Sequence, residues 1–167
     1  MPSEICKFHM RILGAALLPP AGGCIGACIV RKHVSPWYTG LKKPSWTPPD
    51  YAFGPIRGIL HTGIGFASYL VYRDGDGFSG SAKLPLILYG THLALNLSWA
   101  PLFFYLKNLD FGFWGIKLVT VSGIMTAHAF YRVNKNAAYL FAPYLLFLGF
   151  TTALMYNIRQ LNKKPLQ

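Results

Sequence analysis

Six polar or basic side chains interrupt the long apolar runs of this chain, and they are the residues most able to do chemistry: Arg57, His61, His92, Asn96, Lys117 and His128. Ionisable groups inside apolar runs are costly, so they are candidates for function by default. No Asp or Glu lies deep in any run, which argues against a carboxylate-based proton relay or sodium site. The histidines form no zinc motif with a third ligand nearby, so we expect neither a metal site nor a cofactor.

The spacing of these groups places them on particular helix faces. Arg57 and His61 are four residues apart and share one face, and so do His92 and Asn96. Asn96 fits two roles, a hydrogen bond between helices or the lining of a ligand pocket. Arg57 and Lys117 each lie within about two turns of a predicted helix end, which favours snorkelling of their charged ends toward the membrane interface.

The elements that must position these residues are predicted to be membrane helices. The chain has 167 residues, of which 53% are hydrophobic and only 13% are charged, against about 25% charged in a typical soluble domain. Uncharged stretches approach the roughly 20 residues needed to cross a bilayer. We therefore predict one all-α membrane domain over residues 1–167, with five transmembrane helices at about 12–30, 51–72, 84–106, 111–131 and 137–158. The first run is long for a signal peptide and is expected to be retained.

The net charge of +11 comes from 16 basic and 5 acidic residues. Most of the basic residues lie between the apolar runs, as expected for flanks near anionic lipid headgroups, so no nucleic-acid partner is expected. The balance of basic residues on the two sides favours a cytosolic position for the first loop and the C-terminus.

The segment over residues 31–50 differs from the apolar runs. Its four prolines exclude a long regular helix, and its aromatic content is too high for a disordered linker. Because Trp and Tyr are favoured at membrane interfaces, we expect an ordered lid there, formed by Trp37, Tyr38, Pro44, Trp46, Pro48 and Pro49.

Several motifs together resemble the translocator protein family, also known as the peripheral-type benzodiazepine receptor or tryptophan-rich sensory protein family. They are W-Y-T-G-L-K-K-P-S-W-T-P-P at 37–49, G-P-I-R-G-I-L-H at 54–61, G-F-A-S-Y-L-V at 65–71, L-A-L-N-L-S-W-A-P-L-F-F at 93–104 and P-Y-L-L-F-L-G-F-T-T-A-L at 143–154. The match covers nearly the whole chain, with the same number of helices and the same loop lengths.

The resemblance implies a five-helix bundle whose cavity opens under the first loop. Animal members lie in the outer mitochondrial membrane, bind cholesterol and porphyrins, and are linked to sterol import. We therefore expect a lipid-binding or transport protein rather than an enzyme, with cholesterol and porphyrins or haem precursors as ligands. Its partners would be membrane lipids, a second copy of the chain and other outer-membrane proteins. Two alternatives remain, a porphyrin-degrading or stress-sensing membrane protein and a scaffold regulated by ligand.

The resemblance also implies site residues. The cavity would be lined by Ala27, Val30, Phe53, Gly54, Ile56, Arg57, His61, Asn96, Trp99, Phe111, Trp114, Leu118, Phe147, Thr151 and Leu154. A sterol-recognition motif falls at Leu154, Tyr156 and Arg159, where Tyr156 and Arg159 would meet the sterol hydroxyl and Leu154 would pack against its rings. Arg57, Phe111 and Phe147 stand where many members have tryptophan, and a diverged animal member would fit these departures.

Overall fold

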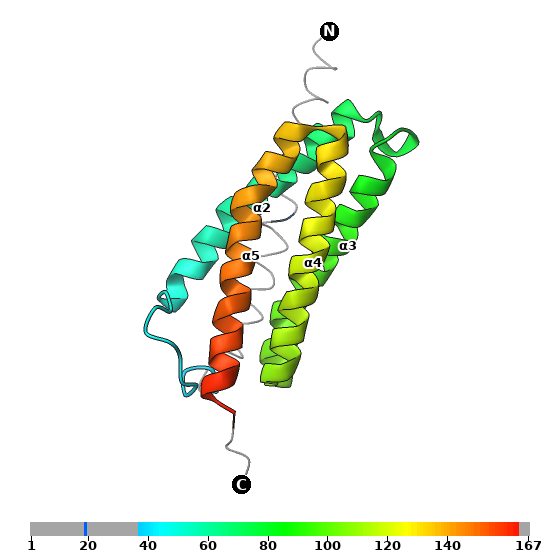
Figure 1. Cartoon of the computed structure of the whole chain (residues 1–167). Helices are drawn as coiled ribbons and strands as arrows, with labels where there is room; N and C mark the ends of the chain where they lie inside the picture. Colours follow the sequence, from blue (N-terminus) through cyan, green and yellow to red (C-terminus); the bar gives the residue numbers. More distant parts are fainter. Residues whose placement is uncertain (1–18, 20–36, 164–167) are drawn as a thin grey trace.

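The computed structural model describes residue 19 and residues 37–163 (Figure 1). This part of the chain contains no strand and folds into four α-helices and one short 3-10 helix: α2 (Asp50–Asp74), η1 (Gly77–Ser79), α3 (Lys83–Leu106), α4 (Leu109–Val133) and α5 (Lys135–Leu161). The prediction of an all-α chain is confirmed for these residues. The helix expected over residues 12–30, with Ala27 and Val30, lies outside the described residues.

The four long helices run side by side along one axis (Figure 1). α4 packs most extensively against α5 and α3, and α2 packs mainly against α5. α2 and α3 have little direct contact with each other. Residues that connect α2 to α3 therefore do so across the interior of the bundle.

Asparagine side chains define the starts of two helices. Asn108 precedes α4 and accepts hydrogen bonds from the backbone N–H groups of Asp110 at 2.9 Å and Phe111 at 3.1 Å. Asn134 precedes α5 and accepts one from Ala137 at 2.9 Å. These bonds satisfy backbone donors that have no partner within the helix. They fix where α4 and α5 begin, and hence which residues of each helix face the interior.

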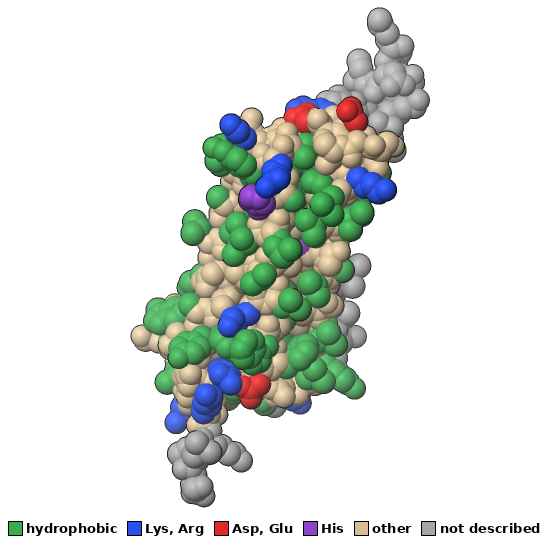
Figure 2. Space-filling model, turned by 45° about the vertical axis from the view of Figure 1, so that its right-hand side comes forward, with side chains coloured by type: hydrophobic (Ala, Val, Ile, Leu, Met, Phe, Trp, Pro, Cys, Tyr) green, Lys and Arg blue, Asp and Glu red, His purple; other side chains and the backbone are tan. Residues whose placement is uncertain are grey.

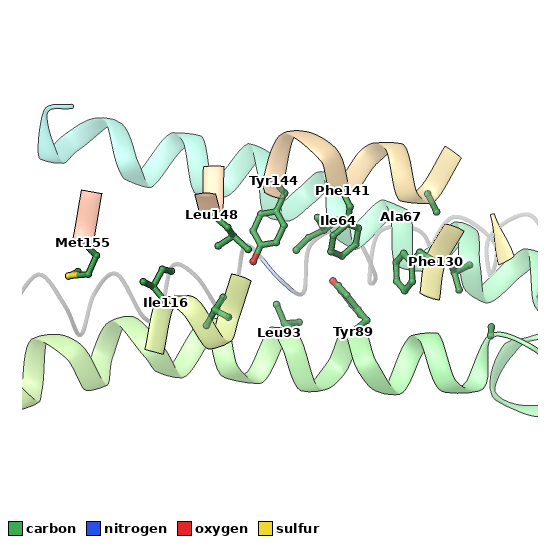
Figure 3. Packing of buried hydrophobic residues seen from close by; sticks show 14 of the residues in the cluster. Ile64, Ala67, Tyr89, Leu93, Ile116, Phe130, Phe141, Tyr144, Leu148 and Met155 are labelled. Carbon is green, nitrogen blue, oxygen red and sulfur yellow. The ribbon is translucent and has the colours of Figure 1, made fainter. Parts of the chain in front are cut away.

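The helices enclose a core rich in aromatic side chains (Figure 3). Phe130 from α4 and Phe141 from α5 have ring centroids 5.2 Å apart, and Tyr89 from α3 lies 5.8 Å from Phe130. Ile64 and Ala67 of α2 are fully buried in the same cluster. The core cluster extends along the bundle to Phe103 and Met155, and Ile116, Tyr144 and Leu148 belong to it.

Much of the outer surface is apolar. Figure 2 shows hydrophobic side chains spread over the middle of the molecule, with Lys, Arg, Asp and Glu gathered mostly toward its two ends. Large side chains such as Ile59, Val121 and Leu146 are exposed on three different helices. Among the described helices, α5 is the one long and apolar enough to cross a membrane by length and composition. This distribution is the one expected for a surface in contact with lipid.

Candidate functional site

The loop over residues 37–49 folds against the ends of α3 and α5. Trp37 packs edge-on against Phe103 of α3, with ring centroids 5.6 Å apart. Trp46 packs in the same way against Phe150 of α5, also at 5.6 Å. The loop passes beside the C-terminal end of α5 and then leads into α2 (Figure 1). It therefore spans two elements that are far apart in the sequence.

Polar contacts also hold this loop, which we call the lid. Two hydrogen bonds join Lys42 to Asn162 beyond the end of α5, at 3.0 and 2.8 Å. The ammonium of Lys43 lies 3.9 Å from the ring centroid of Tyr38 and 3.4 Å from the Asp50 carboxylate. Burial raises the pKa of Tyr38 to about 12, and the charge of Asp50 adds to this shift. Tyr38 is therefore a neutral phenol at physiological pH.

A small cavity of about 20 Å³, room for about one water molecule, lies between the helices. All four long helices contribute to its walls, which consist of Arg57, Asn96, Trp99, Ile116, Tyr144, Phe147, Leu148 and Thr151. Most of these side chains are apolar or aromatic. The cavity thus has the character of a ligand site in a helix bundle, where a few polar groups orient a largely apolar ligand.

A chain of hydrogen bonds crosses the bundle at the cavity. The Arg57 guanidinium donates to Asn96 Oδ1 at 2.6 Å, and the Asn96 amide nitrogen donates to the Tyr144 hydroxyl. That hydroxyl lies 2.8 Å from His92 Nε2, and His92 Nδ1 lies 2.8 Å from Ser122 Oγ. In Figure 3 the Tyr144 hydroxyl points into the space between the helices. One network therefore links α2, α3, α5 and α4.

The direction of these bonds assigns the tautomer of His92. The Ser122 hydroxyl donates its proton to the Val119 carbonyl at 2.8 Å, so it accepts a hydrogen bond from His92 Nδ1–H. Nε2 then has a lone pair that accepts the Tyr144 hydroxyl proton. The network is thus complete with a neutral imidazole.

Stacked aromatic rings connect the lid to the cavity walls. Phe103, which contacts Trp37, stacks on Trp99 at 5.6 Å with the two rings almost parallel. Phe150, which contacts Trp46, stacks on Phe147 at 6.5 Å. Trp99 and Phe147 both line the cavity. Each lid tryptophan is therefore one phenylalanine away from a wall of the cavity.

Two glycines let α4 approach the aromatic wall of α3. A Cβ atom at Gly112 would lie 2.5 Å from the Phe103 ring, and one at Gly115 would lie 2.5 Å from the Trp99 ring. The Trp99 indole N–H donates to the Gly112 carbonyl at 3.0 Å. The orientation of Trp99 in the cavity wall therefore depends on the absence of side chains at these positions.

The structure brings together five of the cavity residues expected from the sequence, namely Arg57, Asn96, Trp99, Phe147 and Thr151. The sequence interpretation missed Ile116, Tyr144 and Leu148. Tyr144 belongs to a motif noted at 143–154, and its spacing of three residues from Phe147 places both on one helix face. That spacing was a signal that could have identified it.

Other expected cavity residues lie elsewhere, and these expectations were wrong for the cavity described here. Trp114 and Leu118 are 60% and 55% exposed on the outer face of α4. Each is two residues from Ile116, which rotates it by about 200° around the helix axis. Ile56 is also exposed, at 40%, and Gly54 has no neighbour that a Cβ would meet.

The remaining expected residues lie near the cavity but outside its walls. Phe53 contacts the wall residue Phe147 at 6.3 Å, and Phe111 is partly buried at the start of α4. His61 is buried with its ring 5.9 Å from that of Tyr144, and neither of its ring nitrogens has a hydrogen-bond partner in the part of the chain that the structure describes. Phe53 and His61 therefore contact wall residues without lining the cavity themselves.

The charged ends of Arg57 and Lys117 were both expected to extend toward the membrane interface, and the structure shows a different direction for each. Lys117 is exposed on the outer face of α4, with its ammonium 4.5 Å from the Trp114 ring centroid. Arg57 instead turns inward to Asn96. The expectation for Arg57 was wrong because a hydrogen-bond acceptor on another helix lies within reach.

The three residues of the expected sterol motif do not share one surface. Leu154 is buried, at 4% exposure, whereas Tyr156 is exposed and lies 5.7 Å from the Phe113 ring. Arg159 pairs with Asp110 through its Nε at 2.5 Å. Leu154 and Tyr156 therefore lie on different faces of α5, and the sterol motif stays a prediction. Tyr156 and Arg159 both contact Phe113 and form an outer surface with it.

The apolar outer surface, the helical bundle and the internal cavity define an all-α membrane protein. The chain matches the TspO/MBR family over residues 15–161 and belongs to it, which confirms the resemblance found in the sequence. It is 40% identical to the translocator protein of Homo sapiens over 146 residues, which are 87% of this chain and 86% of that protein. It is 36% identical to the tryptophan-rich protein TspO of Chlorobaculum tepidum, over 85% of this chain and 89% of that one. It is 34% identical to translocator protein 2 of Homo sapiens, over 89% of both chains.

Proposed function

We propose that this protein binds amphiphilic ring-containing ligands, porphyrins and cholesterol, in the membrane and takes part in their transport. The observation that carries the proposal is the cavity, in which aromatic walls at Trp99 and Phe147 lie beside the polar pair Arg57–Asn96. A flat apolar ring system can stack on such walls. A polar substituent on the ring system can meet the polar pair.

The porphyrin part of the proposal rests on these inner walls. The cavity of about 20 Å³ has room for about one water molecule, whereas pockets for drug-sized ligands have roughly 300–1,000 Å³. A porphyrin therefore requires the walls to move apart. The lid is attached to Phe103 and Phe150 by ring packing. These non-covalent contacts can separate, which would let the lid and the cavity walls move apart.

The cholesterol part rests on the outer surface of α5. Tyr156 is exposed there and supplies a hydroxyl beside the apolar ring of Phe113. The charge of Arg159 is already paired with Asp110, so the Tyr156 hydroxyl is the better partner for a sterol hydroxyl. A sterol at this surface would lie between the protein and the lipid.

We place the protein in the outer mitochondrial membrane as a bundle of five transmembrane helices with a cytosolic C-terminus, linked to mitochondrial sterol handling. Its role would be binding and transport rather than catalysis. Support comes from the 40% identity to a protein named translocator protein. A second copy of the chain and other outer-membrane proteins are the partners we propose.

Tryptophan fluorescence tests the porphyrin part. The chain has four tryptophans, of which Trp99 lines the cavity and Trp114 is exposed on the outer face of α4. Protoporphyrin added to the purified protein in detergent should quench the emission. Trp99→Phe should remove more of the quenching than Trp114→Phe, its matched control. Equal losses in the two variants, or no saturable quenching, would contradict binding in the cavity.

A further inference from the structure

Arg57 carries a positive charge inside the bundle that no carboxylate in the described part of the chain balances. That part contains four carboxylate side chains, at Asp50, Asp74, Asp76 and Asp110. All four lie in turns or at helix ends. Arg57 is seven residues into α2, so it lies roughly 10 Å along the axis from Asp50. Its hydrogen-bond partner among the described residues is the neutral amide oxygen of Asn96, at 2.6 Å.

Three of these carboxylates already have cationic partners. Asp50 pairs with Lys43, Asp74 with Arg73 and Asp110 with Arg159. These three carboxylates are thus engaged with basic residues at the two ends of the bundle. Lys43, Arg73 and Arg159 each face a carboxylate of the protein, whereas Arg57 faces the cavity.

The other polar groups of the cavity wall are already engaged. The Asn96 amide nitrogen donates to Tyr144, the Trp99 indole donates to the Gly112 carbonyl, and the Thr151 hydroxyl donates to the Phe147 carbonyl. A guanidinium has five N–H donors, and Asn96 takes only one of those of Arg57 among the described contacts. Among the described polar groups of the cavity wall, the guanidinium N–H groups of Arg57 are therefore the donors that remain for a ligand.

The chemistry of these donors selects the ligand's head group. A guanidinium presents a planar fork that matches a carboxylate with two parallel hydrogen bonds. A buried cation is costly until an anion pairs with it. A sterol hydroxyl offers neither the charge nor the second acceptor, so it would leave the cation unbalanced. The apolar walls, Ile116 and Leu148 among them, then suit the body of the ligand.

The geometry points to a cavity that selects amphiphiles with a carboxylate head group, with Arg57 as the residue that determines this specificity. The inference rests on the proposed function, in that the cavity must first admit a ligand. Two sources share the required chemistry, the propionate of a tetrapyrrole and the head group of a long-chain fatty acid. Neutral sterols are excluded from the inner cavity and bind at the outer surface around Tyr156 instead.

The test compares each acid with its neutral ester. Protoporphyrin IX and its dimethyl ester form one pair of probes, and palmitate and methyl palmitate form the other. Each is titrated by calorimetry against the full chain in detergent. A charge-assisted hydrogen bond contributes about 1.5–3 kcal/mol, so at least one acid should bind roughly tenfold to a hundredfold more tightly than its ester. A preference within the porphyrin pair alone identifies a tetrapyrrole, and one within the palmitate pair alone identifies a fatty acid.

Two variants assign the preference to Arg57. Arg57→Gln should remove the difference in affinity between acid and ester. Asn96→Asp keeps the guanidinium and gives it an internal carboxylate, so it should remove the same difference even if Arg57→Gln does not fold. Arg73→Gln, a change at an exposed arginine at the other end of α2, is the matched control and should leave the difference intact.

The outcomes separate the two proposals. Equal affinity of acid and ester for the unmodified protein would overturn the specificity inference and leave the proposed binding function standing. A preference that survives in both Arg57→Gln and Asn96→Asp would also overturn it. Failure of all four probes to bind would overturn the cavity as a ligand site, and with it both the porphyrin part of the proposed function and the specificity inference.

Discussion

Asn162 and Lys42 lie 120 residues apart in the sequence and are joined by two hydrogen bonds. The Lys42 backbone N–H donates to Asn162 Oδ1 at 3.0 Å, and Asn162 Nδ2 donates to the Lys42 carbonyl at 2.8 Å. One side-chain amide thus pairs with both backbone groups of one lid residue. This arrangement ties the lid to the end of α5, the helix that supplies half of the cavity wall.

Asn162→Ala should loosen the lid. Each hydrogen bond contributes about 1 kcal/mol, so losing both should raise the opening equilibrium of the lid about tenfold to thirtyfold. The direct measurement is hydrogen exchange at the Lys42 amide, whose proton is the donor in one of the two bonds. Asn157→Ala is the control, because the hydrogen bond of Asn157 among the described residues lies within α5, to the Ala153 carbonyl. Unchanged exchange at Lys42 in Asn162→Ala would show that other contacts hold the lid.

Tyr144→Phe should destabilise the bundle, because it removes the central hydroxyl of the hydrogen-bond chain. His92 Nε2 and the Asn96 amide would lose their shared partner, and each buried unsatisfied group costs about 1–3 kcal/mol. Thermal unfolding followed by circular dichroism in detergent should show a lower midpoint. Tyr139→Phe removes a hydroxyl from an exposed position on the same helix and should have little effect. Equal midpoints for the two variants would mean that the chain of bonds contributes no stability.

Gly115→Ala should displace Trp99 from the cavity wall. The added Cβ would lie 2.5 Å from the Trp99 ring, and overpacking of this kind costs about 1–3 kcal/mol. We expect a lower unfolding midpoint together with weaker protoporphyrin quenching. Gly90→Ala, where a Cβ meets nothing within 4 Å, should instead be neutral or slightly stabilising because alanine favours the helix. A result in which both variants behave like the unmodified protein would contradict the close packing of α3 and α4.

A photoreactive sterol should label Tyr156 and Phe113 rather than Leu154. Tyr156 and Phe113 are in contact on the outer surface, whereas Leu154 is buried in the bundle. Peptide mapping by mass spectrometry after irradiation locates the label. Tyr156→Phe should reduce the yield several-fold through loss of the hydroxyl, which contributes about 1 kcal/mol. Labelling of Leu154 would move the sterol into the interior and contradict an outer site.

The sequence located the described helices well, because apolar runs bounded by Gly, Pro and Asp are strong signals. Each described helix nevertheless begins one or two residues before the expected range; α4, for example, begins at Leu109 rather than 111. The difference at α4 and α5 arises from capping by Asn108 and Asn134. Such caps extend a helix beyond its apolar run and leave no trace in hydropathy.

The faces of the helices were harder to predict. In a soluble helix the apolar face is the buried one, but lipid is as apolar as the protein interior. Trp114 and Leu118, which the family resemblance implied as cavity residues, face outward, while Ile116 faces the cavity, and apolar character alone does not distinguish the two directions. For Arg57 the direction depended on Asn96, a residue 39 positions away on another helix. Sequence spacing within one helix contains no information on such a partner.

Two separate aromatic connections attach the lid to the cavity walls. Trp37 reaches Trp99 through Phe103, and Trp46 reaches the opposite wall through Phe150. Loss of either lid tryptophan leaves the other connection in place, so a single substitution removes only part of the attachment. A sequence can therefore drift at one of these tryptophans without losing the lid. Substitution of both tryptophans would remove both aromatic connections at once and leave the lid attached by contacts such as the Lys42–Asn162 hydrogen bonds.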